Sequence, residues 1–343
     1  MTSKSDIKQK GVSAAKYTVV FKGLSQFLLL LVNVLIVRAL SESSYGVYNL
    51  FYSVIALLAV FASMGIPNTL QRFIPEYYAK GEFRIANRLY RMASALRLLS
   101  SIILVGLILA FWETTAVYLK IENYKFIFTF FILIIFMHLQ RQLLEICLEG
   151  YFLQKFRHAI SIVFVSLRVI GYSLAILLKG DLFFIVLIDL FAYILSFFGL
   201  EFFYHKKIPK DGGQAGHFEK HEKARLIRYA SYSNFNDAGV GLLGVSFDNF
   251  IIAVYLDPVS VGAYAFCNRL SSICQRLTPA NYLLDVIRPL FFAFTELNES
   301  GKIRAVYQLL LKINYIFSFP LYAFVAVFGK EIILAIFGGK FIT

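Results

Sequence analysis

The stretch RALSESSYGVYNL at residues 38–50 decides the fold, because the chain uses it twice. A shift of 216 residues (254 minus 38) places it on VYLDPVSVGAYAF at residues 254–266. Over residues 33–48 the two copies share six identical pairs: Asn33 and Asn249, Ile36 and Ile252, Leu40 and Leu256, Ser44 and Ser260, Gly46 and Gly262, and Tyr48 and Tyr264. A weaker echo follows, since AKGEFR at 79–84 resembles ESGKIR at 299–304. The sequence therefore predicts an internal repeat.

The composition is that of a protein embedded in a membrane. Of the 343 residues, 59% are hydrophobic and only 16% are charged, and the mean hydropathy is +0.68. Soluble domains are about half apolar and about a quarter charged. The formal net charge of +13 does not indicate nucleic-acid binding, because the basic residues lie between apolar runs, where they favour an anionic cytoplasmic leaflet. A polytopic, all-α membrane protein is therefore expected.

Nine apolar runs are long enough to cross a hydrocarbon core of about 30 Å. They lie at about 17–38, 45–66, 92–112, 124–146, 159–178, 182–203, 230–256, 261–284 and 306–328. A tenth span is expected to begin at KEIILAIFGGKFIT, residues 330–343. Gly46 is expected to permit a tight bend in the short outer turn between the first and second spans. Tyr45 and Tyr48 are expected to lie at the membrane–water interface on that side.

The links between the runs predict the orientation and the domains. Lysine and arginine concentrate in alternate links, most of all after the sixth span, and this places the N-terminus in the cytoplasm. The polar interval 206–227 is expected to connect an N-terminal six-helix bundle, 1–205, to an incomplete C-terminal bundle, 228–343. Six spans separate the two copies of the repeat, an even number. The halves should therefore share one orientation around a central cavity, as in transporters built from parallel repeats.

Ionisable side chains within the spans are the candidate site residues, because burying them in hydrocarbon costs several kcal/mol. The residues expected to line the cavity are Arg38, Arg168, Asp248, Arg269 and Arg276, with Asn33 and Asn249 from the repeat. Arg269 and Arg276 are seven residues apart, which places them on one face of a helix. The alternative for all of these charges is snorkelling at span ends or ion pairing between helices.

The sign of these charges favours an anionic cargo. Arginines outnumber carboxylates in the spans, where only Asp189 and Asp248 are well embedded. Arginine stays charged and binds phosphate through two hydrogen bonds, so an arginine-lined cavity suits a phosphorylated lipid. A transporter of organic cations would instead require buried carboxylates.

No enzymatic or metal site is expected. The G-x-G-x-x-G pattern at Gly239, Gly241 and Gly244 lies in an apolar run, where small residues favour close helix packing rather than dinucleotide binding. His217 and His221 have no third ligand, and the three cysteines lack metal-site spacing. No cofactor is therefore expected.

Three segments together resemble the polysaccharide biosynthesis membrane proteins. They are RALSESSYGVYNL, SMGIPNTLQRFIPEYYAKGEFRIANRLY at 63–90, and LIRYASYSNFNDAGVGLLGVSFDNFIIAVYLDPVSVGAYAF at 226–266. These proteins are the O-antigen-type flippases of the multidrug/oligosaccharidyl-lipid/polysaccharide exporter superfamily. The resemblance covers nearly the whole chain.

The resemblance implies two bundles of six helices around a central cavity. It implies that an undecaprenyl-diphosphate-linked oligosaccharide crosses to the outer leaflet of a bacterial or archaeal cytoplasmic membrane by alternating access, with proton or sodium coupling. The implied partners are that glycolipid, membrane lipids and polysaccharide polymerase or assembly proteins, and the implied state is a monomer that binds no nucleic acid. By position, Arg38 matches the arginine that ends the first span, Asp248 the acidic residue of the seventh, and Arg269 and Arg276 the arginine-bearing eighth.

The chain departs from this family at its end. Family members have twelve to fourteen spans, and this sequence stops in the expected tenth, so it is either a fragment or the product of a truncated gene. Three other functions stay open: a cation-coupled multidrug exporter, a membrane scaffold that does not transport, and a membrane glycosyltransferase or ligase. The last would need a large outer loop, which the short links do not supply.

Overall fold

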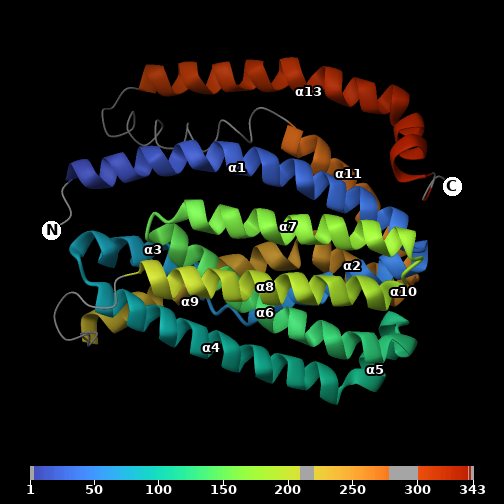
Figure 1. The fold of residues 1–343 in the computed structure, drawn as a ribbon, viewed down its shortest axis with the longest axis horizontal. Helices are drawn as coiled ribbons and strands as arrows, with labels where there is room; N and C mark the ends of the chain where they lie inside the picture. Colours follow the sequence, from blue (N-terminus) through green and yellow to red (C-terminus); the bar gives the residue numbers. More distant parts are fainter. Residues whose placement is uncertain (1–3, 209–219, 278–299, 339, 341–343) are drawn as a thin grey trace. The chain divides into compact units, whose positions relative to one another are not determined.

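A computed structural model describes residues 4–208, 220–277, 300–338 and 340 (Figure 1). These residues are nearly all helical and contain no strand, which confirms the predicted all-α membrane architecture. The chain divides into two compact units, Met1–Gly262 and Ala263–Thr343.

The first unit contains eleven labelled elements among the described residues, and a further helix begins in it. They are α1 (Lys4–Ala39), α2 (Glu42–Phe61), α3 (Ile66–Lys80), α4 (Phe83–Ala110), α5 (Trp112–Leu119), η1 (Glu122–Tyr124), α6 (Lys125–Gly150), α7 (Gln154–Leu177), α8 (Leu182–Lys207), α9 (Lys220–Leu242) and α10 (Val245–Tyr255). Helix α1 packs along α7, and α6 and α7 both pack on α8. Helix α11 (Pro258–Leu277) crosses the division between the units, and α13 (Ser300–Phe337) lies in the second.

Six of the described helices are long and apolar enough to cross a membrane: α2, α4, α6 with η1, α7, α8 and α13. Helices α9 and α10 would make a seventh span, bent by 45° at the break between them. In α1, the segment Gly23–Ala39 forms a shorter apolar helix. The predicted eighth span is described only as far as Leu277, in α11, and its remainder lies outside the described residues.

Two predicted spans differ from the structure. The second, 45–66, is interrupted after α2, where Met64 and Gly65 take positive φ angles of 47° and 70°, and the chain then continues as α3. Residues 330–337, expected to begin a tenth span, instead continue α13 without a break. The reason is local, because KEIILAIF contains no helix-breaking residue, and the first glycine after it, Gly338, has a φ of 71°.

The helix boundaries follow the repeat. Adding 216 to the last residue of α1, 39, gives 255, where α10 ends. Adding 216 to the first residue of α2, 42, gives 258, where α11 begins. Even the helix caps correspond: Ser41 Oγ accepts a hydrogen bond from the Ser44 amide at 3.2 Å, and Asp257 Oδ1 accepts one from the Ser260 amide at 2.7 Å. The repeated unit is therefore a pair of helices joined by a short capped turn.

The two copies of the repeat contact each other at Gly46 and Gly262, which occupy equivalent positions in the two copies. A Cβ atom on Gly46 would lie 1.6 Å from the carbonyl oxygen of Pro258, and one on Gly262 would lie 2.8 Å from that of Glu42. Since 42 plus 216 is 258 and 46 plus 216 is 262, the contact is reciprocal, as at a two-fold axis. Gly46 therefore permits a close crossing of α2 and α11 rather than the tight turn that was predicted.

The repeat turn also leads directly into the bundle. Tyr45 and Tyr48 were expected at the membrane interface, but they are 0% and 2% exposed. Helix α2 begins at Glu42, so one turn of helix already carries both rings among the neighbouring helices. The two rings therefore pack inside the helix bundle, and the prediction that they lie at the membrane interface is wrong.

Helices α3 and α9 are joined by polar contacts. Arg225 donates to both carboxylate oxygens of Glu76, at 2.9 and 2.8 Å. Asn68 Nδ2 donates to Asp237 Oδ2 at 2.8 Å and to Ser233 Oγ at 2.5 Å. The approach is close, because a Cβ on Gly65 would lie 2.0 Å from the Ala230 carbonyl oxygen. A bidentate ion pair thus fixes the first turns of α9 to the C-terminal part of α3.

The Glu76–Arg225 pair should make the stability depend on pH. Hydrogen bonding from Arg225, reinforced by Lys80, lowers the pKa of Glu76 from 4.5 to about 2. A depressed folded-state pKa gives a contribution that is complete above the ordinary value and is lost as the pH falls towards the lowered one. We expect Glu76→Gln to lower the thermal midpoint at about pH 7 and to flatten its decline between about pH 5 and pH 2.

The matched control for this experiment is Glu113→Gln. The Glu113 side chain is 91% exposed and lies 3.4 Å from Lys125, so its loss should leave the pH profile of unfolding unchanged. Equal profiles for the two variants, measured in the same detergent, would contradict a specific role for Glu76.

Candidate functional site

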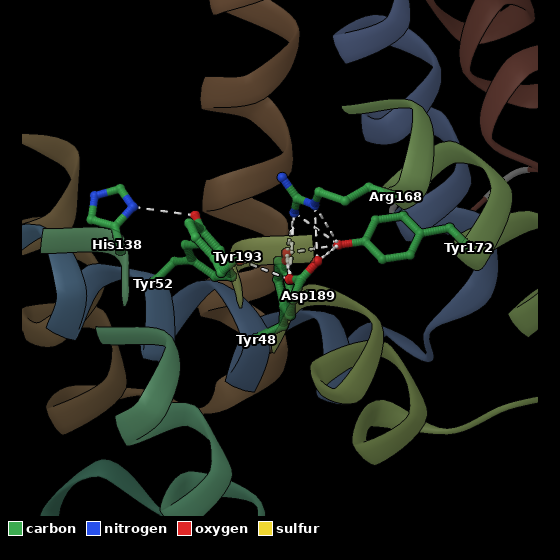
Figure 2. Close-up of polar contacts among 7 residues, drawn as sticks. All are labelled: Tyr48, Tyr52, His138, Arg168, Tyr172, Asp189 and Tyr193. Carbon is green, nitrogen blue, oxygen red and sulfur yellow. Dashed lines mark hydrogen bonds and ion pairs between the residues drawn. The ribbon is translucent and has the colours of Figure 1, made fainter. Parts of the chain in front are cut away.

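A polar cluster lies among helices α2, α7 and α8 within the first unit (Figure 2). It consists of Tyr48 and Tyr52 on α2, Arg168 and Tyr172 on α7, and Asp189 on α8, and we call it the Arg168–Asp189 cluster. Helix α8 is apolar along most of its length, and Asp189 falls on its inward face with Ile185 and Tyr193, one turn to either side. The helical period therefore directs the carboxylate into the bundle.

Every oxygen of the Asp189 carboxylate is hydrogen bonded. Arg168 Nε donates to Oδ1 at 2.8 Å, and the Tyr172 hydroxyl donates to the same oxygen at 2.6 Å. The hydroxyls of Tyr48 and Tyr52 donate to Oδ2 at 2.8 and 2.7 Å. Asp189 is 0% exposed. The four donors therefore satisfy the hydrogen-bonding capacity of a fully buried side chain.

The guanidinium of Arg168 is held as tightly. Its Nη2 donates to the hydroxyls of Tyr48 and Tyr172, both at 2.8 Å, and its side chain is 12% exposed. Each of these two hydroxyls thus accepts from arginine and donates to aspartate. A buried ion pair is favourable only when further hydrogen bonds satisfy both partners, and here the tyrosines supply them. The cluster joins α2, α7 and α8 into one unit.

A second polar pair lies beside the cluster. His138 Nδ1, on α6, is 3.2 Å from the hydroxyl of Tyr193 on α8 (Figure 2). Near it, Arg141 forms an ion pair with Glu145 at 2.7 Å and lies 4.0 Å from the ring centroid of Phe164. The polar layer of the bundle therefore extends from α7 across α8 to α6.

The structure separates the predicted site residues. Arg168 joins the cluster, whose other members were not predicted as site residues. Asn249 is buried on α10 and donates to Ser53 Oγ on α2 at 2.8 Å, while Asp248 beside it is half-buried. Arg168 and Asn249 thus both face α2, through Tyr48 and Ser53 respectively.

The other predicted residues lie elsewhere. Arg38 is exposed in the last turn of α1, and Asn33 is half-buried on the same helix. Arg269 is half-buried on the part of α11 that belongs to the second unit. The side chain of Arg276 lies outside the described residues. Their part in a common cavity remains a prediction.

The tyrosines of the cluster were missed by sequence reasoning. The signal was present in the spacing, since Tyr48 and Tyr52, Arg168 and Tyr172, and Asp189 and Tyr193 are each four residues apart. Three apolar spans therefore each present two polar side chains on one helical face, one turn apart. A search for charged residues alone overlooks such pairs.

The ion pairs also revise the charge argument. Arg168 is compensated by Asp189, Arg141 by Glu145, and Arg157 by Glu149 at 2.5 Å. Arg97 differs, since it is 0% exposed and its Nη2 donates to the amide oxygen of Gln142 at 2.6 Å. Because these three arginines are already paired with carboxylates, fewer arginines are available to meet an anionic cargo than the sequence count suggests.

The part of the chain that the structure describes contains no group of side chains suited to bind a metal ion. There, no three His, Cys, Asp or Glu side chains lie close enough together to hold an ion. Among the described residues, the polar partners of Asp189 are arginine and tyrosine side chains.

Comparison with known proteins places this architecture in a family. The family described as polysaccharide biosynthesis protein matches residues 13–295. Among solved structures, the fold is similar to the inward-facing conformation of a multidrug resistance MATE family transporter of the MOP superfamily, with 13% identity and a TM-score of 0.64. That match covers 94% of this chain and 76% of the transporter. None of the curated proteins compared with the chain matches it. The chain is a multi-pass membrane protein that belongs to the polysaccharide biosynthesis protein family.

Proposed function

We propose that this protein flips a lipid-linked oligosaccharide, of the undecaprenyl-diphosphate type, from the cytoplasmic to the outer leaflet. The glycan would feed surface polysaccharide synthesis, such as that of O-antigen, in a bacterial or archaeal cytoplasmic membrane. The observation that carries this proposal is the family match over residues 13–295. The similarity to the fold of a transporter supports a carrier rather than an enzyme.

The repeat supports alternating access as the mechanism. Two halves of one orientation can rock against each other and expose a central site to each side in turn. The reciprocal contact of Gly46 and Gly262 lies where the two copies meet, so it would serve as the pivot of that motion. The Arg168–Asp189 cluster would keep the first bundle rigid during the motion, because it locks three helices together. We expect proton or sodium coupling, a monomer, a cytoplasmic N-terminus, and polymerase or assembly proteins as partners.

Cargo recognition is assigned to arginines outside the cluster. We assign a structural part to Arg168, because Asp189 balances its charge. We propose that Arg38, Arg269 and Arg276 meet the diphosphate, since guanidinium groups bind phosphate oxygens in pairs. Asp248 and Asn249 would shape the cavity beside α2, where Asn249 already contacts Ser53.

Drug export is the second candidate, because the similar solved fold is a multidrug resistance transporter. The two functions differ in a simple phenotype. A drug exporter would raise the resistance of a sensitive strain to organic cations and would leave glycan export unchanged.

Complementation of a flippase-null strain tests the proposed function. Expression of the protein should restore surface polysaccharide and remove the lipid-linked glycan that accumulates in the cytoplasmic leaflet. Arg269→Ala and Asp248→Ala should abolish the rescue at unchanged protein levels, whereas Arg304→Ala, at an exposed position on α13, should preserve it. Accumulated glycan that persists while the protein is present in the membrane at normal levels would refute the proposal.

A further inference from the structure

A cleft of about 350 Å³ opens between α3 and α9. Three arginines line it, Arg72, Arg225 and Arg228, together with three aromatic residues, Phe73, Tyr229 and Tyr232. It lies in the first unit and is distinct from the Arg168–Asp189 cluster, with which it shares no residue. The start of α9 belongs to the side of the membrane that the charge distribution predicts to be cytoplasmic.

Helix α9 forms one wall of the cleft through its helical period. Arg225, Arg228, Tyr229 and Tyr232 recur at intervals of three, one and three residues, which brings them to one face. Helix α3 supplies the other wall with Arg72 and Phe73. The two walls are held together by the Glu76–Arg225 ion pair and by the edge-to-face contact of Phe73 with Tyr229, whose centroids are 5.7 Å apart.

The charge of this cleft is not balanced. Glu76 neutralises Arg225 through its two hydrogen bonds. Arg72 instead stacks on aromatic rings, with its guanidinium carbon 4.6 Å from the centroid of Tyr229 and 5.5 Å from that of Phe73. Within residues 4–208, 220–277 and 300–338, no carboxylate pairs with Arg72 or Arg228. Among the described residues, two guanidinium groups of the cleft therefore have no paired carboxylate.

This chemistry fits an anion with several oxygens. A guanidinium that lies flat on a ring keeps its N–H groups directed sideways, where they can bind two phosphate oxygens at once. The two arginines of the cleft that pair with no described carboxylate, Arg72 and Arg228, match in number the two phosphates of a diphosphate. The aromatic side chains give the rest of the wall an apolar surface, which suits a lipid-bearing headgroup better than a fully hydrated ion.

We propose that this cleft binds a diphosphate headgroup, as a docking site on the predicted cytoplasmic side that precedes the central cavity. The inference rests on the proposed function for its cargo, but the binding itself does not require transport. The Glu76–Arg225 pair then acts as the frame of the site, and Arg72 and Arg228 as the groups that contact the phosphates.

The experiment measures binding of inorganic pyrophosphate to the full chain in phosphatidylcholine nanodiscs, by isothermal titration calorimetry. The double variant Arg72→Gln/Arg228→Gln should weaken this binding by about tenfold or more, because charge-assisted hydrogen bonds are lost. Arg72→Lys/Arg228→Lys keeps the charge but loses the paired geometry, so its affinity should fall between the two. The matched control Arg91→Gln/Arg304→Gln removes the same charge at two exposed positions and should bind as the wild type does.

Competition identifies the source of the phosphate. Undecaprenyl diphosphate placed in the nanodisc should displace pyrophosphate, whereas phosphatidylglycerol at the same density should not, since it carries a single phosphodiester. Unchanged pyrophosphate binding in the Arg72/Arg228 double variants, no binding by the wild type, or equal competition by phosphatidylglycerol would each overturn the proposal. If binding behaves as expected while complementation fails, the proposed function is refuted and the diphosphate site stands.

Discussion

Replacement of Asp189 by Asn should lower the free energy of unfolding by about 3–5 kcal/mol, the usual cost of removing one partner of a buried ion pair. The amide keeps the shape of the carboxylate, but Arg168 is left charged in a site where its side chain is only 12% exposed. In the wild type, the hydroxyls of Tyr48 and Tyr52 donate to Oδ2 and the hydroxyl of Tyr172 donates to Oδ1. In the variant, one of these two oxygens is replaced by an amide NH₂ group, which cannot accept those hydrogen bonds. Charge and hydrogen bonding thus change in the same direction.

The measurement is reversible unfolding of the purified protein in detergent, with two comparisons. Glu113→Gln makes the same chemical change at a side chain that is 91% exposed, and it should alter stability little. The double variant Arg168→Met/Asp189→Asn removes both charges, keeps an amide oxygen that can accept from the tyrosine hydroxyls, and should recover part of the loss, because Arg168 is no longer left as an unpaired buried charge. A double variant as unstable as Asp189→Asn would show that the ion pair is not the source of the effect.

Gly46→Ala should lower the free energy of unfolding by about 2–3 kcal/mol, although it adds a single methyl group. The new Cβ would lie 1.6 Å from the carbonyl oxygen of Pro258, so α2 and α11 must move apart. The atom that it meets belongs to the backbone at the start of a helix, and a change of side-chain rotamer cannot relieve the clash. If the crossing is the pivot between the repeated halves, the variant should also lose transport at a temperature where it is still folded.

Two other glycines set the scale for this result. Gly262→Ala makes the reciprocal contact at 2.8 Å from the Glu42 carbonyl oxygen, so its effect should be smaller but in the same direction. Gly106, on α4, has no heavy atom within 4 Å of its Cβ position, and alanine there should be neutral or slightly stabilising, because glycine is a poor helix former. Equal stability of the Gly46 and Gly106 variants, by thermal unfolding, would exclude a close crossing of α2 and α11.

The repeat shows how far the sequence predicts this fold. The offset found in RALSESSYGVYNL reproduces the turn of the second copy, where α10 ends at residue 255 and α11 begins at residue 258, because the same capping pattern specifies the same helix ends. The role of Gly46 was not predictable, since glycine fits both a tight turn and a close helix crossing, and only the neighbouring helix decides between them. The interruption after α2 was hidden as well, because residues 62–65, ASMG, contain no proline and no charge that would mark a break at the end of the apolar run.

The site was predicted less completely than the fold, for a physical reason. A charge in an apolar span is visible in the sequence, so Arg168 was found, but its partner depends on which helices pack together. Asp189 is 21 residues away and Tyr48 is 120 residues away. Tyrosine is also ambiguous in a membrane protein, because the same residue serves at the interface and as a buried hydrogen-bond donor. A second polar residue four positions away, as in Tyr48 and Tyr52, is the feature of the sequence that indicates a buried hydrogen-bond donor rather than a tyrosine at the interface.

The most direct test of the central claim is the movement of a lipid-linked oligosaccharide in proteoliposomes that contain only this protein. A membrane-impermeant glycosidase, added outside, measures the share of the glycolipid that reaches the outer leaflet. With the protein present, we expect external digestion to proceed well beyond the share initially exposed, whereas liposomes with Gly46→Ala should stop at that share. Digestion that ends at the initially exposed share with folded wild-type protein, under an imposed proton or sodium gradient, would contradict the account.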